Sequence, residues 1–331
     1  PDQGVTSYED QVFGLIEIEN KTLEDQVLLK SDGYPTYNFA NVVDDHDMRI
    51  SHVVRGSEYL SSTPKYILLY EAFGYDVPTF VHLPLILGAD GQKLSKRHGA
   101  TSFEELLDQG FLPEAIVNYL GLLGWDPKST RELFTLEDLE ELFNIKGISK
   151  SPAVFDIQKL VWFNEQYLRA MSLEDFKKVS KPYIEKVLPD VDEETLNHIA
   201  SLIQARTGQL TDIPDQIAFL GPDFHVDAED FIHKKSKSTL ESSRTILKDF
   251  LEIFSDIRWE AEALHLAMLD YGKAHGLKNG TVMWPIRIGA SGQKVTPGGA
   301  SDVLILLGKE KALAHLEESL KIIEDTLAKE I

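Results

Sequence analysis

The sequence predicts an α/β segment followed by a long all-α region. Strand and helix patterns alternate over about the first 90 residues, and apolar residues at helical spacing follow from Ser102 onward. No strand pattern of comparable strength appears after about residue 90. A chain of 331 residues has room for two or three domains, each with its own core.

The first elements are strands around a turn. Residues 12–20 ("VFGLIEIEN") and 25–39 ("DQVLLKSDGYPTYNF") alternate apolar and polar side chains, with a turn expected at Asp32-Gly33. Residues 49–56 ("RISHVVRG") are rich in β-branched side chains and predict a further strand.

A parallel crossover follows. Residues 62–74 ("STPKYILLYEAFG") have helical apolar spacing with Gly74 as the stop, and residues 79–88 ("TFVHLPLILG") predict a buried strand. Strand, helix and strand in this order indicate parallel pairing. The next loop is expected at the carboxyl edge of the sheet, where open α/β sheets bind ligands.

The remaining chain predicts helices. Ser102 with Glu105, Thr135 with Asp138 and Ser172 with Asp175 have the spacing of helix N-caps, and the first fits a capping box best. Helical patterns cover residues 196–206, 238–254, 259–276 and 309–327.

The composition excludes several classes of protein. The chain has a formal net charge of −21, no cysteine and no apolar run long enough for a membrane span. Disulfides and cysteine-based zinc sites are excluded, and a reducing, cytoplasmic location is expected. The acidity argues against indiscriminate nucleic-acid binding, yet it leaves room for a local basic face.

One loop departs from the acidic background. "GADGQKLSKRHGATSF" (residues 88–103) gathers Lys93, Lys96, Arg97 and His98 behind two glycines. A solvated basic turn is one interpretation. The other is a loop that closes over a polyanion, where two lysines neutralise charge developing on a pyrophosphate leaving group.

The sequence of this loop and of the segments around it resembles a known family. "KLSKRHG" is similar to the KMSKS signature of class I aminoacyl-tRNA synthetases, in the form found in bacterial glutamyl-tRNA synthetases. "DGYPTYNFANVVDDHDM", "HVVRGSEYLSSTPKYILLYEAFG", the text at residues 118–125 and "PIRIGASGQKVTPGGASDVLILLGKEKAL" resemble the same family in the same order.

The resemblance implies roles for individual residues. It assigns Lys93 and Lys96 as catalytic residues that act on the ATP phosphates and on the adenylate-forming transition state. It assigns Arg55 to the binding of a substrate carboxylate, a task that suits the planar guanidinium group with its paired N–H donors. The remaining implied site residues bind ATP (Ser95, Arg97, Glu58, Tyr59) or line the glutamate and ATP pocket (Tyr37, Asn41). The family often has Trp where this chain has Tyr59.

The family pattern is incomplete in this sequence. The HIGH motif and the amino-terminal arginine-serine region are absent, so we expect a fragment that does not activate glutamate alone. The implied organisation is the end of an inserted acceptor-binding domain (1–36) and the second half of a Rossmann-like catalytic domain (37–99). A helical stem-contact domain (100–165) and an all-α anticodon-binding domain (166–331) follow.

The implied reaction defines the expected partners. A glutamate–tRNA ligase activates glutamate with ATP and transfers it to the tRNA for glutamate. The ATP would carry Mg²⁺ on its phosphates, with no protein-bound metal or zinc. We also expect a monomer, and Arg206 and Gln209 as candidates for anticodon contact.

Several features have a simpler interpretation beside the functional one. Arg55 is also compatible with a surface salt bridge. "DDHD" (44–47) resembles a metal cluster, but adjacent helical residues point in different directions, so a capping segment is expected. "HKKSKS" (233–238) fits a solvated linker or an RNA-backbone contact. His82 fits a satisfied core residue, and the tryptophans Trp125, Trp162, Trp259 and Trp284 fit core packing.

Other functions stay open from the residues alone. A non-catalytic tRNA-binding module would explain the missing half of the site, and another class I-like nucleotidyltransferase would explain the lysine loop. The long helical tail argues against the second. It also argues against a glutaminyl-type synthetase, whose tail resembles β-barrels.

Overall fold

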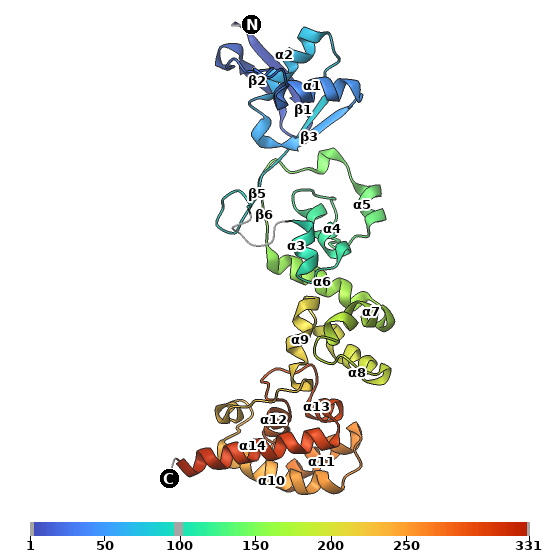
Figure 1. The fold of residues 1–331 in the computed structure, drawn as a ribbon, viewed down its shortest axis with the longest axis vertical. Coiled ribbons are helices and arrows are strands. Elements are labelled where there is room, and N and C mark those ends of the chain that lie inside the picture. Colours follow the sequence, from blue (N-terminus) through green and yellow to red (C-terminus); the bar gives the residue numbers. More distant parts are fainter. Residues whose placement is uncertain (1–2, 96–101, 330–331) are drawn as a thin grey trace. The chain divides into compact units, whose positions relative to one another are not determined.

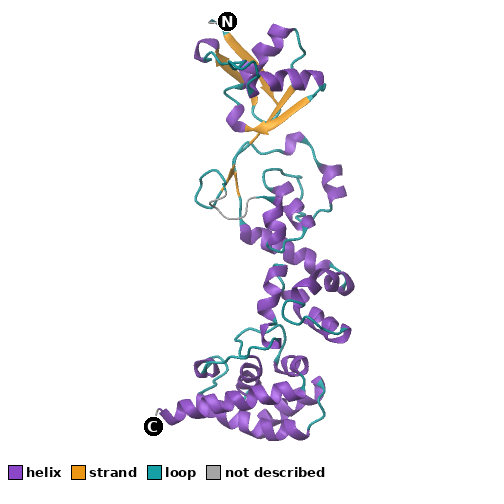
Figure 2. Ribbon diagram, in the orientation of Figure 1, coloured by secondary structure: helices purple, strands orange, loops and turns teal. Residues whose placement is uncertain are grey.

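The computed structural model describes residues 3–95 and 102–329 (Figure 1). The chain forms two compact units. The first unit comprises residues 1–107 and 112–163, and the second comprises residues 108–111 and 164–331. Figure 2 shows strands in the first unit only, as far as the structure describes the chain. The predicted order of an α/β segment followed by an all-α region is therefore confirmed, with the two-residue strand β6 (Ala153–Val154) as an exception in the stretch expected to be helical.

A four-stranded mixed sheet organises the beginning of the first unit. Its strands are β1 (Val5–Asp10), β2 (Gly14–Glu19), β3 (His52–Gly56) and β4 (Thr79–Leu83), in the order β2-β1-β4-β3. β1 and β2 pair antiparallel, whereas β4 is parallel to both β1 and β3. The predicted parallel crossover is thus confirmed, with β3 and β4 as its strands and α2 between them.

Two helices pack on this sheet. These are α1 (Tyr37–Asp47) and α2 (Thr63–Phe73), and α2 ends where Gly74 adopts the left-handed conformation expected of a helix stop. Tyr8 and Phe80 from the sheet meet Val42 of α1 and Tyr66 of α2 in one buried cluster. This core holds the carboxyl ends of β3 and β4 in a defined position.

The strand expected on either side of Asp32-Gly33 does not form. Residues 25–39 contain one isolated antiparallel bridge between Leu29 and Pro35, and the turn at Asp32-Gly33 lies inside it. Pro35 has no N–H to extend the ladder, and the helix α1 begins at Tyr37. The strand prediction was wrong here, although the turn was correct.

The strand predicted over residues 79–88 divides into two. β4 ends at Leu83, and after Pro84 the chain enters β5 (Ile86–Leu87), which pairs in parallel with β6 (Ala153–Val154) in a separate sheet. The break coincides with Pro84, which lacks a ladder donor. The lysine loop therefore follows the small second sheet directly, while its Lys93 pairs with Glu58, just after the carboxyl end of β3 in the main sheet.

Helices complete the first unit. They are α3 (Phe103–Asp108), α4 (Pro113–Leu122), α5 (Leu136–Leu142) and the start of α6 (Ile157–Ala170). The Ser102 hydroxyl accepts from the Glu105 amide at 3.1 Å, and the Glu105 carboxylate accepts from the Ser102 amide at 3.0 Å. Thr135 and Asp138 form the same reciprocal cap, so both sequence-predicted N-caps are confirmed.

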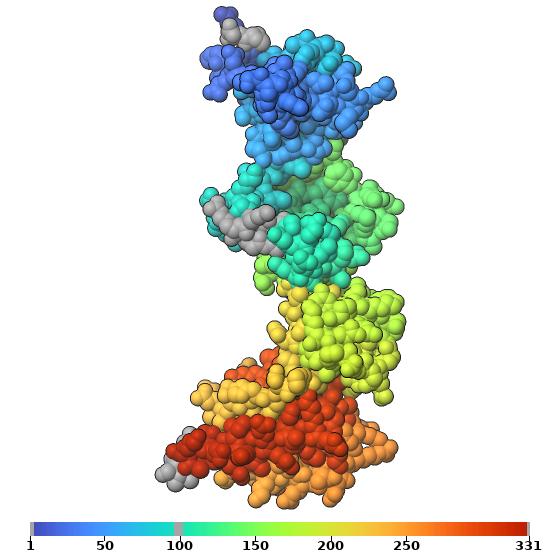
Figure 3. All heavy atoms as spheres, viewed as in Figure 1, coloured from blue at the N-terminus to red at the C-terminus, as the bar shows by residue number. Residues whose placement is uncertain are grey.

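Helices joined by loops make up the described residues of the second unit, which contain no named strand. Its further helices are α7 (Leu173–Ile184), α8 (Glu193–Ile203), α9 (Ile213–Gln216), α10 (Leu240–Asp256), α11 (Ala261–Ala274), α12 (Asn279–Ser291), α13 (Ala300–Leu307) and α14 (Lys309–Lys329). Ser172 caps α7 through the Asp175 amide, as predicted. In Figure 3 the long helix α14, in red, lies along the surface beside α10, with which it packs.

Short 3₁₀ helices connect these elements at residues 20–22, 57–59, 145–147, 204–206, 210–212, 218–220 and 228–231. Within residues 3–95 and 102–329, no helix combines the length and apolar character that a membrane crossing requires.

Candidate functional site

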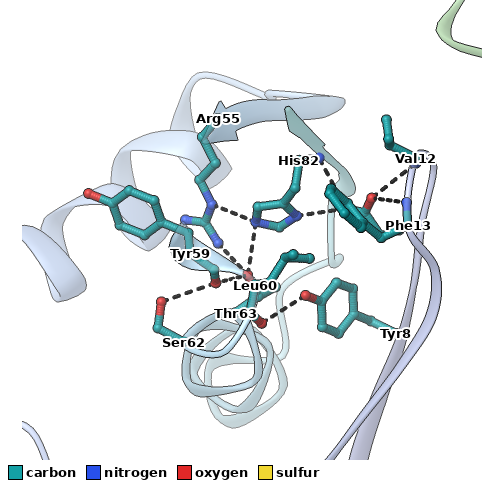
Figure 4. A network of polar contacts seen from close by, with 10 residues as sticks. Tyr8, Val12, Phe13, Arg55, Tyr59, Leu60, Ser62, Thr63 and His82 are labelled. Carbon is teal, nitrogen blue, oxygen red and sulfur yellow. Dashed lines mark hydrogen bonds and ion pairs between the residues drawn. The ribbon is translucent and has the colours of Figure 1, made fainter. Parts of the chain in front are cut away.

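Arg55 lies near the carboxyl end of β3 and is held by two side chains (Figure 4). Its Nε donates to His82 Nε2 at 3.2 Å, and one terminal nitrogen donates to Thr63 Oγ1 at 2.7 Å. The guanidinium carbon lies 4.8 Å from the ring centre of Tyr59 and 4.7 Å from that of Tyr66. The two hydrogen bonds fix one edge of the planar guanidinium group, and the faces of the aromatic rings stabilise its positive charge.

No described carboxylate forms an ion pair with Arg55, so the structure does not support the surface salt bridge that the residue pattern allowed. A guanidinium has five N–H groups, and two of them are used by His82 and Thr63. The other three have no hydrogen-bond partner among the described residues. This edge can therefore bind an anionic group in the bidentate manner of arginine.

His82 on β4 lies behind Arg55 and is completely buried, as is the side chain of Asp10 at the end of β1. Asp10 Oδ2 accepts from His82 Nδ1 at 2.6 Å and from the His82 amide at 3.1 Å. Burial lowers the pKa of His82, while Asp10 acts in the opposite direction. The pair is therefore a hydrogen bond from a neutral imidazole to a carboxylate, and His82 is a satisfied core residue as expected.

Tyr37 and Asn41 lie one turn apart on the same face of α1. The Tyr37 ring is largely exposed, and its centre lies 6.4 Å from that of Tyr59. The side-chain oxygen of Asn41 is buried and has no hydrogen-bond partner in the described structure. An unpartnered buried acceptor is costly, and a ligand with a donor group would remove the cost.

Lys93 emerges from a tight hairpin. The Gly91 amide donates to the Gly88 carbonyl at 3.0 Å, and Gly91 has a positive φ of 75° that favours glycine. Lys93 then donates to Glu58 Oε1 at 2.9 Å. The pKa of Glu58 lies below its usual range because its own backbone amide and then Lys93 favour the charged form. Two residues assigned separately to ATP are thus brought together.

Lys96, Arg97 and His98 lie outside the described residues. Ser95 is described and has contacts of its own. The contributions assigned to Lys96 and Arg97 therefore stay predictions.

The acidic segment 44–47 lies at the end of α1 without forming a metal centre among the described residues. Asp45 Oδ2 accepts from the Tyr70 hydroxyl at 3.4 Å, and His46 stacks on Tyr75 with ring centres 3.5 Å apart. Burial raises the pKa of Asp45. The segment anchors the end of α1 through these contacts.

The segment 233–238, expected as a solvated linker or an RNA-backbone contact, forms a turn in the second unit with exposed lysines. His233 and Ser238 pair as an antiparallel bridge, and the His233 ring stacks on Trp284 with centres 3.8 Å apart. The Thr281 hydroxyl donates to the Ser236 carbonyl at 2.6 Å. Its exposed lysines are Lys234, Lys235 and Lys237. The turn presents positive charge in a fixed arrangement, and the RNA-backbone contact stays a prediction.

Arg206 and Gln209 make contacts within the second unit. Arg206 donates to the Thr296 carbonyl at 3.1 Å, and Gln209 Nε2 donates to the Gln109 carbonyl at 3.1 Å. These bonds are compatible with a positioning role in the fold, and anticodon contact stays a prediction for both residues.

The tryptophans take structural positions. Trp125 is buried and donates to the Asn144 carbonyl at 3.1 Å, as expected of a core residue. Trp162, Trp259 and Trp284 are each partly buried.

Two residues of the site carry no recognisable signal in the sequence. Asp10 belongs to a strand that the sequence pattern did not predict, and Thr63 opens α2 as one polar residue among many. Asp10 and His82 are separated by 72 positions. Asp10 follows Glu9 directly, and aspartate is seldom buried, so the local sequence contained no signal for its role.

Comparisons with known proteins agree with this architecture. The model described as tRNA synthetases class I (E and Q), catalytic domain, matches residues 1–162, and the model described as anticodon binding domain matches residues 171–320. The glutamate–tRNA ligase of Clostridium botulinum strain Eklund 17B is 48% identical over 98% of this chain and 67% of its own length. That of Clostridium tetani is 48% identical over 96% of this chain and 65% of its own length.

Solved structures of glutamate–tRNA ligases are also similar to this chain in fold. A glutamate tRNA ligase from Elizabethkingia meningosepticum, in complex with its amino acid, superposes with a TM-score of 0.83 at 32% identity, covering 98% of this chain and 67% of that one. The glutamate–tRNA synthetase of Elizabethkingia anophelis gives 0.81 at 32% identity over 97% and 67%. The chain spans about two thirds of the length of these relatives.

Proposed function

This chain belongs to the glutamate–tRNA ligase family of class I tRNA synthetases, and from this premise we propose that it serves the ATP-dependent activation of glutamate and its transfer to tRNA. In the first step a glutamate carboxylate oxygen attacks the α-phosphate of ATP, so that glutamyl-adenylate forms and pyrophosphate leaves. In the second step a hydroxyl group of the tRNA attacks the acyl carbon, and AMP leaves.

The arrangement around Arg55 is the observation that carries this proposal. On a guanidinium fixed by His82 and Thr63, three N–H groups have no partner among the described residues and form a preorganised receptor for a carboxylate. Tyr59 and Tyr66 flank the charge and limit its access to water. In this proposal Arg55 binds a carboxylate of glutamate.

The other assigned residues surround this receptor. We assign Tyr37 and Asn41 to the glutamate and ATP pocket, supported by their shared face on α1 and the unpartnered oxygen of Asn41. Glu58 and Tyr59 are assigned to the adenosine side.

Lys93 and Lys96 are assigned to the phosphates of ATP and to the charge that develops on the leaving pyrophosphate. Ser95 and Arg97 are assigned to ATP binding on the same loop. To contact phosphate, Lys93 must break its ion pair with Glu58. The free-energy cost of breaking this pair is small because both side chains are more than 40% exposed.

Magnesium is expected to arrive with ATP. In the ranges that the structure describes, no three histidine, aspartate or glutamate side chains converge to hold a metal ion. We therefore propose that the phosphates of ATP provide most of its ligands, which is how Mg²⁺ is commonly held.

The second unit is proposed to bind the tRNA, with Arg206 and Gln209 near the anticodon. The match of residues 171–320 to an anticodon binding domain supports this proposal. We further propose that the protein acts as a monomer in the cytoplasm, a location that its lack of cysteine favours.

Substitution of Arg55 tests the proposed function. In a full-length ligase that carries this sequence, Arg55→Ala is expected to raise KM for glutamate by about 30-fold or more, because a buried charged hydrogen bond is worth ~2 kcal/mol or more. KM for ATP should change far less. Arg55→Lys should restore part of the loss, since one ammonium cannot reproduce the planar fork.

Glutamate-dependent ATP–pyrophosphate exchange at varied glutamate provides the measurement. Arg49→Ala removes an exposed arginine near the start of β3 and serves as the control, with unchanged kinetics expected. An unchanged KM for glutamate in Arg55→Ala would remove Arg55 from substrate binding.

A further inference from the structure

We infer that His82 is a positioning residue, locked by Asp10 into the tautomer whose Nε2 accepts from Arg55 and thereby aims the guanidinium at the substrate carboxylate. This inference deepens the proposed function and rests on its assignment of Arg55. It concerns how the receptor is built, and it gives specific roles to Asp10 and His82, two residues that do not contact substrate.

The partners on the two sides of the ring determine its proton. Asp10 Oδ2 lies 2.6 Å from His82 Nδ1, and a carboxylate accepts hydrogen bonds, so Nδ1 carries the proton. Arg55 Nε lies 3.2 Å from His82 Nε2, and a guanidinium only donates, so Nε2 must be unprotonated. The neutral Nδ1–H form is the single state that satisfies both neighbours.

Asp10 is itself fixed by the turn that follows β1. Its Oδ1 accepts from the amides of Val12 and Phe13 at 3.0 and 2.8 Å, while Oδ2 faces the His82 ring and amide. These donors occupy the carboxylate on both oxygens, so it cannot rotate without losing them. A rigid acceptor at Nδ1 is what selects one tautomer of the imidazole.

Thr63 completes the orientation without competing for the same proton. Its hydroxyl donates to the Tyr59 carbonyl at 2.7 Å and accepts from Arg55 at 2.7 Å. Its oxygen also lies 3.2 Å from His82 Nε2. If Nε2 carried a proton, that proton would point toward the region that Arg55 Nε–H now occupies. The wrong tautomer would therefore displace the guanidinium from its position.

Two substitutions of His82 separate its two hydrogen bonds. In His82→Asn the side-chain amide reaches as far as Nδ1 and can still donate to Asp10, but nothing reaches Arg55. In His82→Gln the side-chain oxygen reaches about as far as Nε2 and can accept from Arg55, but the bond to Asp10 is lost. The variants are matched because both replace a buried imidazole with a neutral amide.

The inference predicts an ordered outcome. In the full-length ligase, His82→Asn should raise KM for glutamate on the order of tenfold, because misplacement of a substrate-binding group is costly. KM for ATP should change little. His82→Gln should keep KM for glutamate closer to the parent value. Equal effects of the two variants, or a larger effect of His82→Gln, would overturn the inference and leave His82 with a structural role.

A spectroscopic measurement covers the case in which the variants fold poorly. In the 331-residue chain labelled with ¹⁵N-histidine, ring ¹⁵N shifts and two-bond couplings report which nitrogen carries the proton. The signal is assigned by its loss in either variant. We expect His82 as the Nδ1–H tautomer near neutral pH, and an Nε2–H tautomer would overturn the inference.

The test also separates this inference from the proposed function. If Arg55→Ala leaves KM for glutamate unchanged, the assignment of Arg55 fails whatever the histidine spectrum shows. If Arg55→Ala raises that KM while His82→Asn does not, the proposed function stands and the positioning role of His82 is wrong.

Discussion

Among the described residues, Arg55 contacts aromatic rings and neutral hydrogen-bond acceptors and forms no ion pair with a carboxylate. Arg55 is only partly buried, and its contacts with Tyr59 and Tyr66 are worth about 0.5–2 kcal/mol each. Binding of a carboxylate to this arginine should stabilise the first unit, because a ligand that binds only the folded state shifts the folding equilibrium toward it.

Lys96 provides a prediction that belongs to the transition state. In a full-length ligase, Lys96→Ala should lower the rate of ATP–pyrophosphate exchange by on the order of 10²–10³ and change KM for ATP much less, because the proposed charge develops on the leaving pyrophosphate. Transfer from preformed glutamyl-adenylate to tRNA should suffer less, since that step releases no pyrophosphate.

Single-turnover kinetics of the two steps measure this difference. Lys128→Ala is a suitable control because Lys128 is exposed and pairs with Asp126 at 2.8 Å, away from the assigned residues. A Lys96→Ala enzyme that loses only ATP affinity would contradict the transition-state assignment.

His315 gives the second unit a dependence on pH. The residue is 7% exposed, its Nδ1 lies 2.8 Å from the Ala290 carbonyl, and its ring stacks on Phe224. Burial lowers the pKa of His315, Lys311 acts in the same direction, and Ala290 and Glu318 oppose them. Below the ordinary histidine pKa of 6.5 the unfolded chain binds a proton that the folded chain does not.

The free energy of unfolding should therefore fall as pH falls below about 6.5, by at most ~1.4 kcal/mol per pH unit from this residue. His315→Asn keeps a donor for Ala290 without titrating, and it should flatten this part of the profile. Urea unfolding of the parent, this variant and His265→Asn, an exposed-site control, between pH 7 and 5 checks it. Parallel profiles for parent and His315→Asn would disprove the assignment.

At the scale of elements, proline and glycine decide where the regular structure ends. Pro84 separates β4 from β5 and so moves the lysine loop to a different sheet from the one that carries Arg55. Gly74 and Gly292 end α2 and α12 in the left-handed conformation. Their surroundings differ, and the difference predicts unequal tolerance to substitution.

Gly292→Ala should destabilise the second unit by about 3 kcal/mol or more. Its φ is +66°, and an added Cβ would lie 2.0 Å from the backbone oxygen of His225, so backbone strain adds to a clash with main chain. Gly276→Ala is the matched control, with the same φ of +66° and no atom within 4 Å of the added Cβ. There about 1 kcal/mol is expected from strain alone.

Urea denaturation followed by circular dichroism measures both variants. Similar losses of stability would show that the close approach to His225 has relaxed and that φ alone sets the cost.

At the scale of the whole molecule, the second unit consists of residues 164–331 and a short segment, 108–111, from earlier in the chain. Thr211 Oγ1 donates to the Gln109 carbonyl at 2.7 Å, and the Leu210 amide donates to the Gly110 carbonyl at 3.1 Å. The segment therefore adds hydrogen bonds to a helical core that is otherwise continuous in sequence.

Residues 164–331 alone should fold cooperatively into a helical domain, with a lower Tm than the same helices in the 331-residue chain. The buried side chains of α10, α12 and α14 pack on one another without help from the first unit. Far-ultraviolet circular dichroism with thermal melting tests this. A strand-dominated spectrum or the absence of a cooperative transition would contradict it.

Local patterns in the sequence predicted much of the architecture. The caps at Ser102, Thr135 and Ser172 need residues only three positions apart, and the helix ending at Gly74 follows from apolar spacing and one glycine. Such contacts are made within one or two turns, so a short window contains all of the participants. The parallel crossover was predictable for a different reason: the rules for connections between strands leave few alternatives to a strand–helix–strand unit with parallel strands.

The site depended on information that no short window contains. Arg55 was identified through the resemblance of its segment to the family. Its partner His82 lies 27 positions away in the sequence, and Asp10, which bonds His82, lies 72 positions from that histidine. The sequence alone determined a helical tail, a crossover and a basic loop. Only the tertiary structure decided which buried carboxylate fixes His82 and that Pro84 separates the two sheets, because long-range pairing and burial decide these positions.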